Sequence, residues 1–118
     1  MYTIELYSTQ SNNCPLEKYL GKIASQHKDE EILKIKSMLD LLEEHGLGLM
    51  NIYPNSIKYI QEQIYELRPS KTRILFFCIK DNKIILLNGF EKKTQKTPDK
   101  EKKLAIKYKN DYIKRYGK

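Results

Sequence analysis

Two nearly continuous apolar segments, residues 73–80 and 84–91, follow one another across the dipeptide Asp81-Asn82. Aspartate and asparagine tolerate the left-handed dihedral angles of a tight turn, so this pattern predicts a β-hairpin. Segments without polar alternation are typical of strands that are covered on both faces. We therefore expect these two strands to be central in a sheet and to be covered on both faces for part of their length.

Two further strands are predicted. Residues 63–68 precede the hairpin and are expected to join it through a turn at residues 69–72. Residues 2–8 alternate well enough to form another strand, with Ile4 and Leu6 on one face. The sheet is therefore expected to be small and mostly antiparallel.

Three helices are predicted from apolar side chains spaced three and four residues apart. The first follows Pro15, and the second covers about residues 29–45. The third begins at Thr97-Pro98, with Thr97 as its N-cap. The order strand–helix–helix–strand–strand–strand–helix predicts an α+β fold, in which the sheet packs with an N-terminal helical hairpin and a C-terminal helix. A chain of 118 residues is expected to form one domain over residues 1–118.

The basic side chains are concentrated at one end of the chain. Residues 1–90 carry eleven basic and eleven acidic side chains, whereas residues 91–118 carry eleven basic and four acidic ones, which accounts for the net charge of +7. A neutral body with one strongly basic end favours a polyanionic partner, which would be RNA, DNA or an acidic protein surface. The alternative is a lysine-rich helix whose charges are only solvated.

The cellular compartment follows from two features. No apolar run approaches the roughly 18 residues that span a bilayer, and the first residues lack the basic and apolar regions of a signal peptide. We therefore expect a cytoplasmic protein with no membrane partner. Cys14 and Cys78 are then expected to be reduced thiols, and Cys78, which lies within an apolar strand, is expected in the core.

Motifs for metal or cofactor binding are missing. His27 and His45 lack the spacing of paired metal ligands, and the two cysteines do not form a Cys-x-x-Cys motif. The sequence has no Gly-rich phosphate loop and no Gly-x-Ser-x-Gly motif. We therefore expect neither a metal ion nor a cofactor, with a zinc site built from these four side chains as the alternative.

The predicted hairpins bring charged side chains together. If residues 69–72 and Asp81-Asn82 are the two turns, Arg68 lies opposite Arg73, and Glu66 opposite Leu75. Two opposed arginines repel each other, and Glu66 is the nearest anion that would relieve them; a phosphate is the candidate functional ligand. The alternative is two arginines splayed into water, and a bulge would change the register. The side chains expected on this face are Arg68, Arg73, Asn88, Phe90 and Lys92.

Three segments of the chain together resemble a known family. They are Tyr65-Glu66-Leu67-Arg68, then Arg73-Ile-Leu-Phe-Phe, and then Leu87-Asn-Gly-Phe-Glu-Lys-Lys-Thr-Gln-Lys-Thr-Pro98. Their order and spacing resemble the HigB-type toxins of the RelE superfamily, which are the toxins of bacterial type II toxin–antitoxin modules. The stretch from Phe90 to Pro98 is the most specific of the three.

This resemblance implies a ribosome-dependent, metal-independent mRNA endoribonuclease, in which the 2′-OH of the substrate attacks the adjacent phosphate. Arg68 and Arg73 would hold that phosphate, and one of Lys92, Lys93 and Lys96 would act as general base or acid. No histidine follows position 45, so the resemblance does not identify which residues act as general acid and general base. The further residues expected to contact RNA are Glu66, Asn88, Lys100, Lys103, Lys107 and Tyr108.

The resemblance also implies partners. They are the ribosome with its mRNA, and a cognate antitoxin of the HigA type with a helix-turn-helix domain. Toxin and antitoxin would form a heterodimer or a heterotetramer, and operator DNA would be bound only through the antitoxin. Composition and periodicity fit a second function equally well, namely a non-catalytic basic module of the same fold that binds RNA or the ribosome.

Overall fold

The structure is a computed structural model that describes residues 1–117. Lys118, which contributes to the basic end of the sequence, lies outside the described residues. The elements follow one another in the order β1 (Thr3–Leu6), α1 (Pro15–Ser25), α2 (Asp29–His45), the short 3-10 helix η1 (Gly46–Gly48), α3 (Leu49–Ile52), β2 (Ile57–Gln61), β3 (Ile64–Leu67), β4 (Thr72–Ile79), β5 (Lys83–Glu91) and α4 (Asp99–Tyr116).

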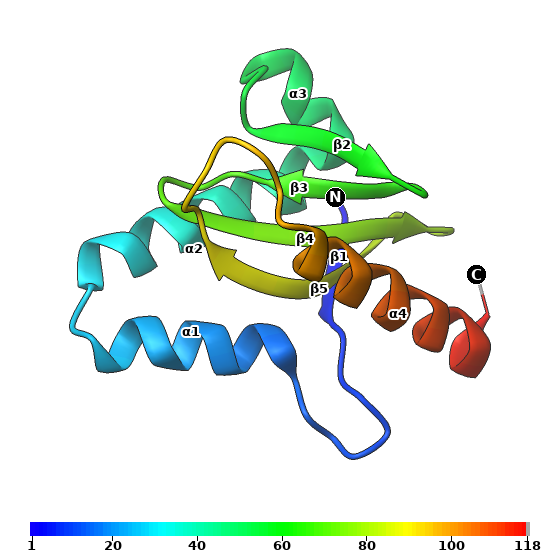
Figure 1. The fold of residues 1–118 in the computed structure, drawn as a ribbon. Helices are drawn as coiled ribbons and strands as arrows, with labels where there is room; N and C mark the ends of the chain where they lie inside the picture. The colour runs from blue at the N-terminus through cyan, green and yellow to red at the C-terminus, as the bar shows by residue number, and fades with distance from the viewer. Residues whose placement is uncertain (118) are drawn as a thin grey trace.

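The five strands form one sheet in the order β1-β5-β4-β3-β2 (Figure 1). Strand β1 pairs with β5 in parallel, and the other neighbouring strands pair antiparallel. The predicted α+β fold with a small, mostly antiparallel sheet is therefore confirmed. The predicted central hairpin is β4–β5, and both of its strands lie inside the sheet.

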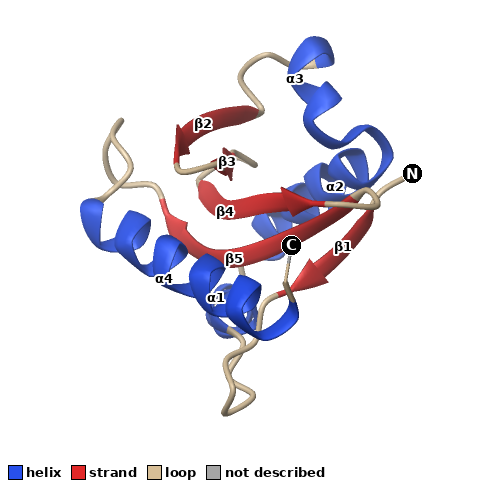
Figure 2. Ribbon diagram, turned by 90° about the vertical axis from the view of Figure 1, so that its right-hand side faces the viewer, coloured by secondary structure: helices blue, strands red, loops and turns tan. Residues whose placement is uncertain are grey.

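The sheet separates two apolar layers. On one face, α1 and α2 pack through residues such as Leu16 and Leu42 against Phe76 and other side chains of the sheet. On the opposite face, α4 packs through Ala105 and Tyr112 (Figure 2). This arrangement explains why the apolar runs of β4 and β5 show no polar alternation, because both faces of these strands are buried.

Strand β2 and the short helices η1 and α3 were not predicted. In β2 only Ile57 is buried, so the segment has little apolar signal. The turn to β3 is formed by Glu62 and Gln63, both with positive φ, although glycine or asparagine usually occupies such positions. The β2–β3 hairpin therefore has none of the usual sequence markers of a turn.

Cys78 departs from its predicted place in the core. The side chain is exposed, because it lies past the part of β4 that pairs with β3 and on the face opposite Phe77, which packs against Tyr112 of α4. Both cysteines are free thiols in the structure. None of the helices within residues 1–117 is long and apolar enough to cross a membrane.

The register of the β4–β5 hairpin contains two compensating irregularities. Ile79 pairs with Lys83, so three residues rather than the predicted two form the turn. A bulge then lies at Leu87, after which Leu75 pairs with Asn88 as predicted. The predicted register is therefore correct at the end of the sheet that holds the arginines, and wrong by one residue near the turn.

Candidate functional site

The two arginines lie side by side on the face of the sheet that α4 covers. Glu66 pairs with Leu75 and Leu67 pairs with Ile74, and continuation of this register places Arg68 opposite Arg73. The carboxylate of Glu66 pairs with one of them, since its Oε1 lies 3.4 Å from Nε of Arg68. Glu66 is therefore the anion next to the arginine pair, as predicted.

Arg73 is buried, with only 7% of its surface exposed. Its Nη1 donates hydrogen bonds to the carbonyl oxygens of Ser70 (2.9 Å) and Thr72 (3.0 Å). Burial, and then the charge of Arg68, lower the pKa of Arg73, whereas Glu66 raises it. The alternative of two arginines splayed into water does not hold, since Arg73 is buried and the Arg68 side chain is 22% exposed beside Glu66. An added anion would relieve the repulsion between the two guanidinium groups.

The segment between β5 and α4 covers the arginines. The hydroxyl of Thr97 donates a 2.7 Å hydrogen bond to Oε2 of Glu66, and the amide of Lys92 donates one of 2.7 Å to the carbonyl of Lys71. Lys92, Lys93 and Lys96 are exposed on this segment. A small pocket lies beneath it, lined by Glu66, Arg73, Phe90, Lys92, Lys93, Thr94, Gln95, Lys96, Thr97 and Pro98.

Thr97 does not cap α4, which corrects the sequence prediction. The helix begins at Asp99, Pro98 occupies the N-cap position, and no side chain accepts a hydrogen bond there. The Thr97 hydroxyl is engaged by Glu66 instead. Asp99 and Glu101 lie in the first turn of α4, where acidic side chains favour the positive end of the helix dipole.

Asn88 links β5 to α4 and is only 3% exposed. Its Nδ2 donates hydrogen bonds to Oε1 (3.0 Å) and to the carbonyl oxygen (3.3 Å) of Glu101, and its Oδ1 is buried without a partner. The position of Asn88 explains how the first turn of α4 is held over the sheet. Direct contact of Asn88 or Glu66 with RNA stays a prediction, and the burial of both side chains does not favour it.

The remaining predicted RNA contacts lie along α4. Lys100, Lys103 and Lys107 are exposed. Tyr108 is half-buried, and its ring stacks on Tyr7 with 4.9 Å between ring centroids, so one face of the ring is already occupied. The three lysines are therefore available to a polyanion, whereas Tyr108 contributes to packing.

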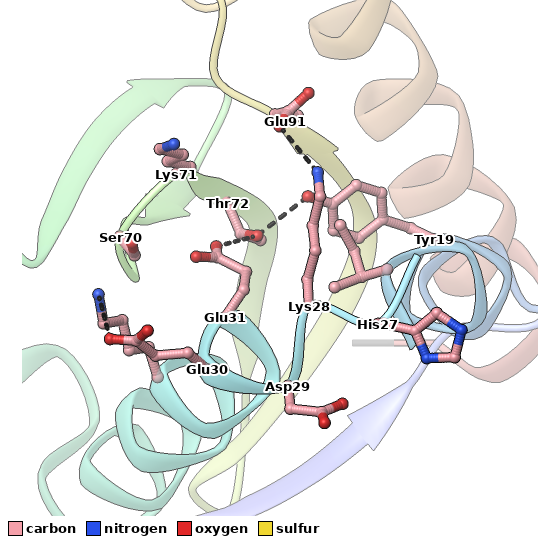
Figure 3. A pocket seen from close by; sticks show the side chains of 12 residues that line it. Tyr19, His27, Lys28, Asp29, Glu30, Glu31, Ser70, Lys71, Thr72 and Glu91 are labelled. Carbon is pink, nitrogen blue, oxygen red and sulfur yellow. Dashed lines mark hydrogen bonds and ion pairs between the residues drawn. The ribbon is translucent and has the colours of Figure 1, made fainter. Parts of the chain in front are cut away.

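The contacts that support β4 behind Arg73 were not predicted. On the opposite face of the sheet, the hydroxyl of Thr72 donates to Oε2 of Glu31 (2.8 Å) and lies 2.9 Å from the hydroxyl of Tyr19 (Figure 3). These contacts join α1, α2 and β4, and they follow from tertiary packing with no local signal in the sequence. They fix the strand position next to Arg73.

The groups available for chemistry are cationic. Among residues 1–117, no group of three or more His, Cys, Asp or Glu side chains is placed to hold a metal ion. His27 lines the pocket of Figure 3, between α1 and α2, and His45 ends α2. Neither histidine lines the pocket over Arg73. The arginine pair and the exposed lysines are suited to bind phosphate.

Fold and site together define a small α+β protein with a basic surface on one face of its sheet. A family model described as "Phage derived protein Gp49-like (DUF891)" matches residues 24–110, and the chain belongs to this family of RelE/ParE-like toxins. Comparison with curated proteins gives no match. Family membership implies a toxin role and an antitoxin partner.

Proposed function

We propose that the chain is a HigB-type toxin that cleaves mRNA on the ribosome. The observation that carries this proposal is the arginine pair, Arg68 and Arg73, beneath a segment with three exposed lysines, in a chain of a toxin family. Such a cluster matches the charge of a phosphate that gains negative charge during transfer. Action on the ribosome would take place in the cytoplasm.

The proposed reaction uses the 2′-OH of the substrate as the nucleophile. A base takes the proton of the 2′-OH, the 2′ oxygen bonds to the adjacent phosphorus, and the bond to the 5′ oxygen breaks. An acid returns a proton to that oxygen, which leaves a 2′,3′-cyclic phosphate and a 5′-OH. One of Lys92, Lys93 and Lys96 would act as base or acid, with Arg68 and Arg73 stabilising the phosphorane. The proposed steps require no metal ion.

The burial of Arg73 suggests why the ribosome would be needed for cleavage. With 7% of its surface exposed, Arg73 can reach a phosphate only after the segment of residues 92–98 moves. Binding to the ribosome would displace that segment and align the 2′-OH with the phosphate, which is a large part of catalysis. Free RNA is therefore expected to be a poor substrate.

The proposed partners follow from the same function. The antitoxin is of the HigA type with a helix-turn-helix domain, and it forms a heterodimer or a heterotetramer with the toxin. It neutralises the toxin by covering the basic face or by keeping the toxin from the ribosome. Operator DNA is bound through the antitoxin only.

A second candidate function is a non-catalytic module that binds RNA or the ribosome. Two observations favour it: Arg73 is buried, and neither histidine of the chain lies at the site. A module of this kind would block translation through its basic face without cleaving RNA.

Primer extension on an mRNA translated in a purified system separates the two functions. New 5′ ends that require both the protein and ribosomes support the nuclease, and intact mRNA with inhibited translation supports the binding module. Lys93→Ala and Arg73→Ala are expected to lower cleavage at least tenfold with the circular dichroism spectrum retained. Lys80→Ala is the matched control, since Lys80 is an exposed lysine in the β4–β5 turn. Equal loss in the control would contradict the assigned site.

A further inference from the structure

A groove runs beside the arginine pocket, between α1 and the first turn of α4. Strand β1 pairs only with residues Lys83–Leu86 of β5, so the rest of β5 extends past it (Figure 1). This extension lines the groove with Gly89, Phe90 and Glu91. The volume of the groove, about 520 Å³, lies within the ~300–1,000 Å³ typical of ligand sites. The lining residues are Tyr19, Lys22, Ile23, Gln26, Lys28, Gly89, Phe90, Glu91, Lys93, Pro98, Lys100 and Glu101.

The groove has an excess of positive charge. Its two acidic side chains are already engaged: Glu91 pairs with Lys28 at 3.6 Å, and Glu101 accepts a hydrogen bond from Asn88 at 3.0 Å. The other lysines of the groove are exposed, and over residues 1–117 they form no ion pair; they are Lys22, Lys93 and Lys100. Three separate segments of the chain therefore present uncompensated cations to one groove.

The groove adjoins the arginine pocket. Phe90, Lys93 and Pro98 line both. At its other end the groove meets the pocket of Figure 3, with which it shares Tyr19 and Lys28. There the positive excess ends, since four acidic lining residues, Asp29, Glu30, Glu31 and Glu91, outnumber the three lysines, Lys28, Lys34 and Lys71. The region of positive charge therefore extends from the arginine pocket through the groove to α1.

We propose that this groove binds the phosphates of single-stranded RNA next to the scissile phosphate, through Lys22, Lys93 and Lys100. The proposal rests on the proposed function, because it extends the RNA path from the arginine pocket. A basic groove with an aromatic residue in it is the usual feature of single-strand binding, and Phe90 is among the residues that line this groove. An acidic peptide segment is the competing occupant, but it would not explain why the groove adjoins the arginine pocket.

Binding of a fluorescent 12-nucleotide RNA with 2′-O-methyl groups tests the proposal, because this RNA cannot be cleaved through a 2′-OH. Fluorescence anisotropy is measured over a range of salt concentrations for the wild type and for the double variant Lys22→Ala/Lys100→Ala. We expect the double variant to bind about tenfold more weakly. Its slope of log K against log salt should be smaller by about 1.4, which is about 0.7 for each lost phosphate contact on a single strand.

The matched control is Lys36→Ala/Lys80→Ala, which removes two exposed lysines outside the groove and should bind as the wild type does. Equal affinity and slope for the two double variants would overturn the proposal, as would no RNA binding by the wild type. A poly-glutamate 12-mer that loses affinity in the groove variant while RNA binding is unchanged would assign the groove to an acidic partner instead. The cleavage assay is independent: RNA binding that depends on the groove without any cleavage refutes the nuclease and leaves the groove assignment standing.

Discussion

Thr97 and Glu66, which are buried and 31 residues apart, share a 2.7 Å hydrogen bond from the Thr97 hydroxyl to Oε2 of the carboxylate. The other carboxylate oxygen faces Arg68 at 3.4 Å. One carboxylate therefore holds both an arginine of the sheet and the segment that carries the exposed lysines. The site is a connected unit, and a change in Glu66 should affect the fold and the lysine segment together.

Glu66→Gln is expected to destabilise the protein by about 3–5 kcal/mol. The substitution removes the negative charge beside Arg68 and Arg73 and leaves the two arginines without a compensating anion. Urea unfolding followed by circular dichroism measures this change. Glu17→Gln is the control, because Glu17 is exposed on α1. A Glu66→Gln variant as stable as this control would show that the carboxylate does not compensate the arginine pair.

Thr97→Val tests the attachment of the lysine segment. Valine keeps the size of threonine but leaves Oε2 of Glu66 without its donor, which should cost about 1–3 kcal/mol. Because the contact holds residues 92–98 over the sheet, trypsin should cut at the lysines of this segment faster than in the wild type. Gln95→Ala, at an exposed position of the same segment where the side chain makes no hydrogen bond within residues 1–117, should leave the rate of cutting unchanged. Equal rates for both variants would contradict the attachment.

The sequence predicted the arginine pair because strand periodicity and turn positions act over short distances. Arg68 and Arg73 are separated by one turn, so their register depends on few residues. Two other features depend on the path of the segment before α4: the burial of Arg73 and the contact between Thr97 and Glu66. No sequence pattern predicts where that segment runs. Longer-range features were missed for this reason.

In the β4–β5 hairpin, the predicted pairing of Leu75 with Asn88 is correct although the predicted turn is not. The three-residue turn shifts the register by one residue, and the bulge at Leu87 reverses the shift. Because a bulge needs no special residue here, a sequence pattern cannot reveal it. The groove between α1 and α4 was likewise not predicted, since Lys22 and Lys100 are brought together only by packing on opposite faces of the sheet.

Gly89→Ala should destabilise the protein by about 1–3 kcal/mol, the cost of overpacking. A Cβ at this position would lie 2.8 Å from Cδ1 of Leu16 and 3.1 Å from Cδ2 of Tyr19, so the fully buried Leu16 side chain or α1 itself would have to shift. Gly21→Ala is the matched control, because a Cβ there meets no atom within 4 Å and alanine favours the helix. Thermal unfolding should show opposite changes in Tm for the two variants, and a stabilised Gly89→Ala variant would contradict close packing of α1 on β5.

The end of α4 is attached to the N-terminal part of the chain through Asp111. This carboxylate accepts a 2.6 Å hydrogen bond from the hydroxyl of Tyr7 and a 2.9 Å hydrogen bond from Nη2 of Arg115. Burial, and then the hydrogen bond to Asp111, raise the pKa of Tyr7 to about 12. The hydrogen bond from Tyr7, and then that from Arg115, lower the pKa of Asp111 below its ordinary value of 3.8, although burial opposes this change.

Asp111 should therefore make stability depend on acidity. A carboxyl group whose pKa is lower in the folded protein than in the unfolded chain stabilises the fold above its unfolded pKa, and this contribution disappears as pH falls through the folded pKa. Asp111→Asn removes the titrating group, so the difference in unfolding free energy between wild type and variant should shrink as pH falls from about 5 to about 2. Urea unfolding at several pH values measures this difference. Asp40→Asn, at an exposed position of α2, is the control and should give a difference that changes less with pH. A wild-type advantage over Asp111→Asn that stays constant down to about pH 2 would mean that Asp111 contributes only a hydrogen bond that does not depend on its charge.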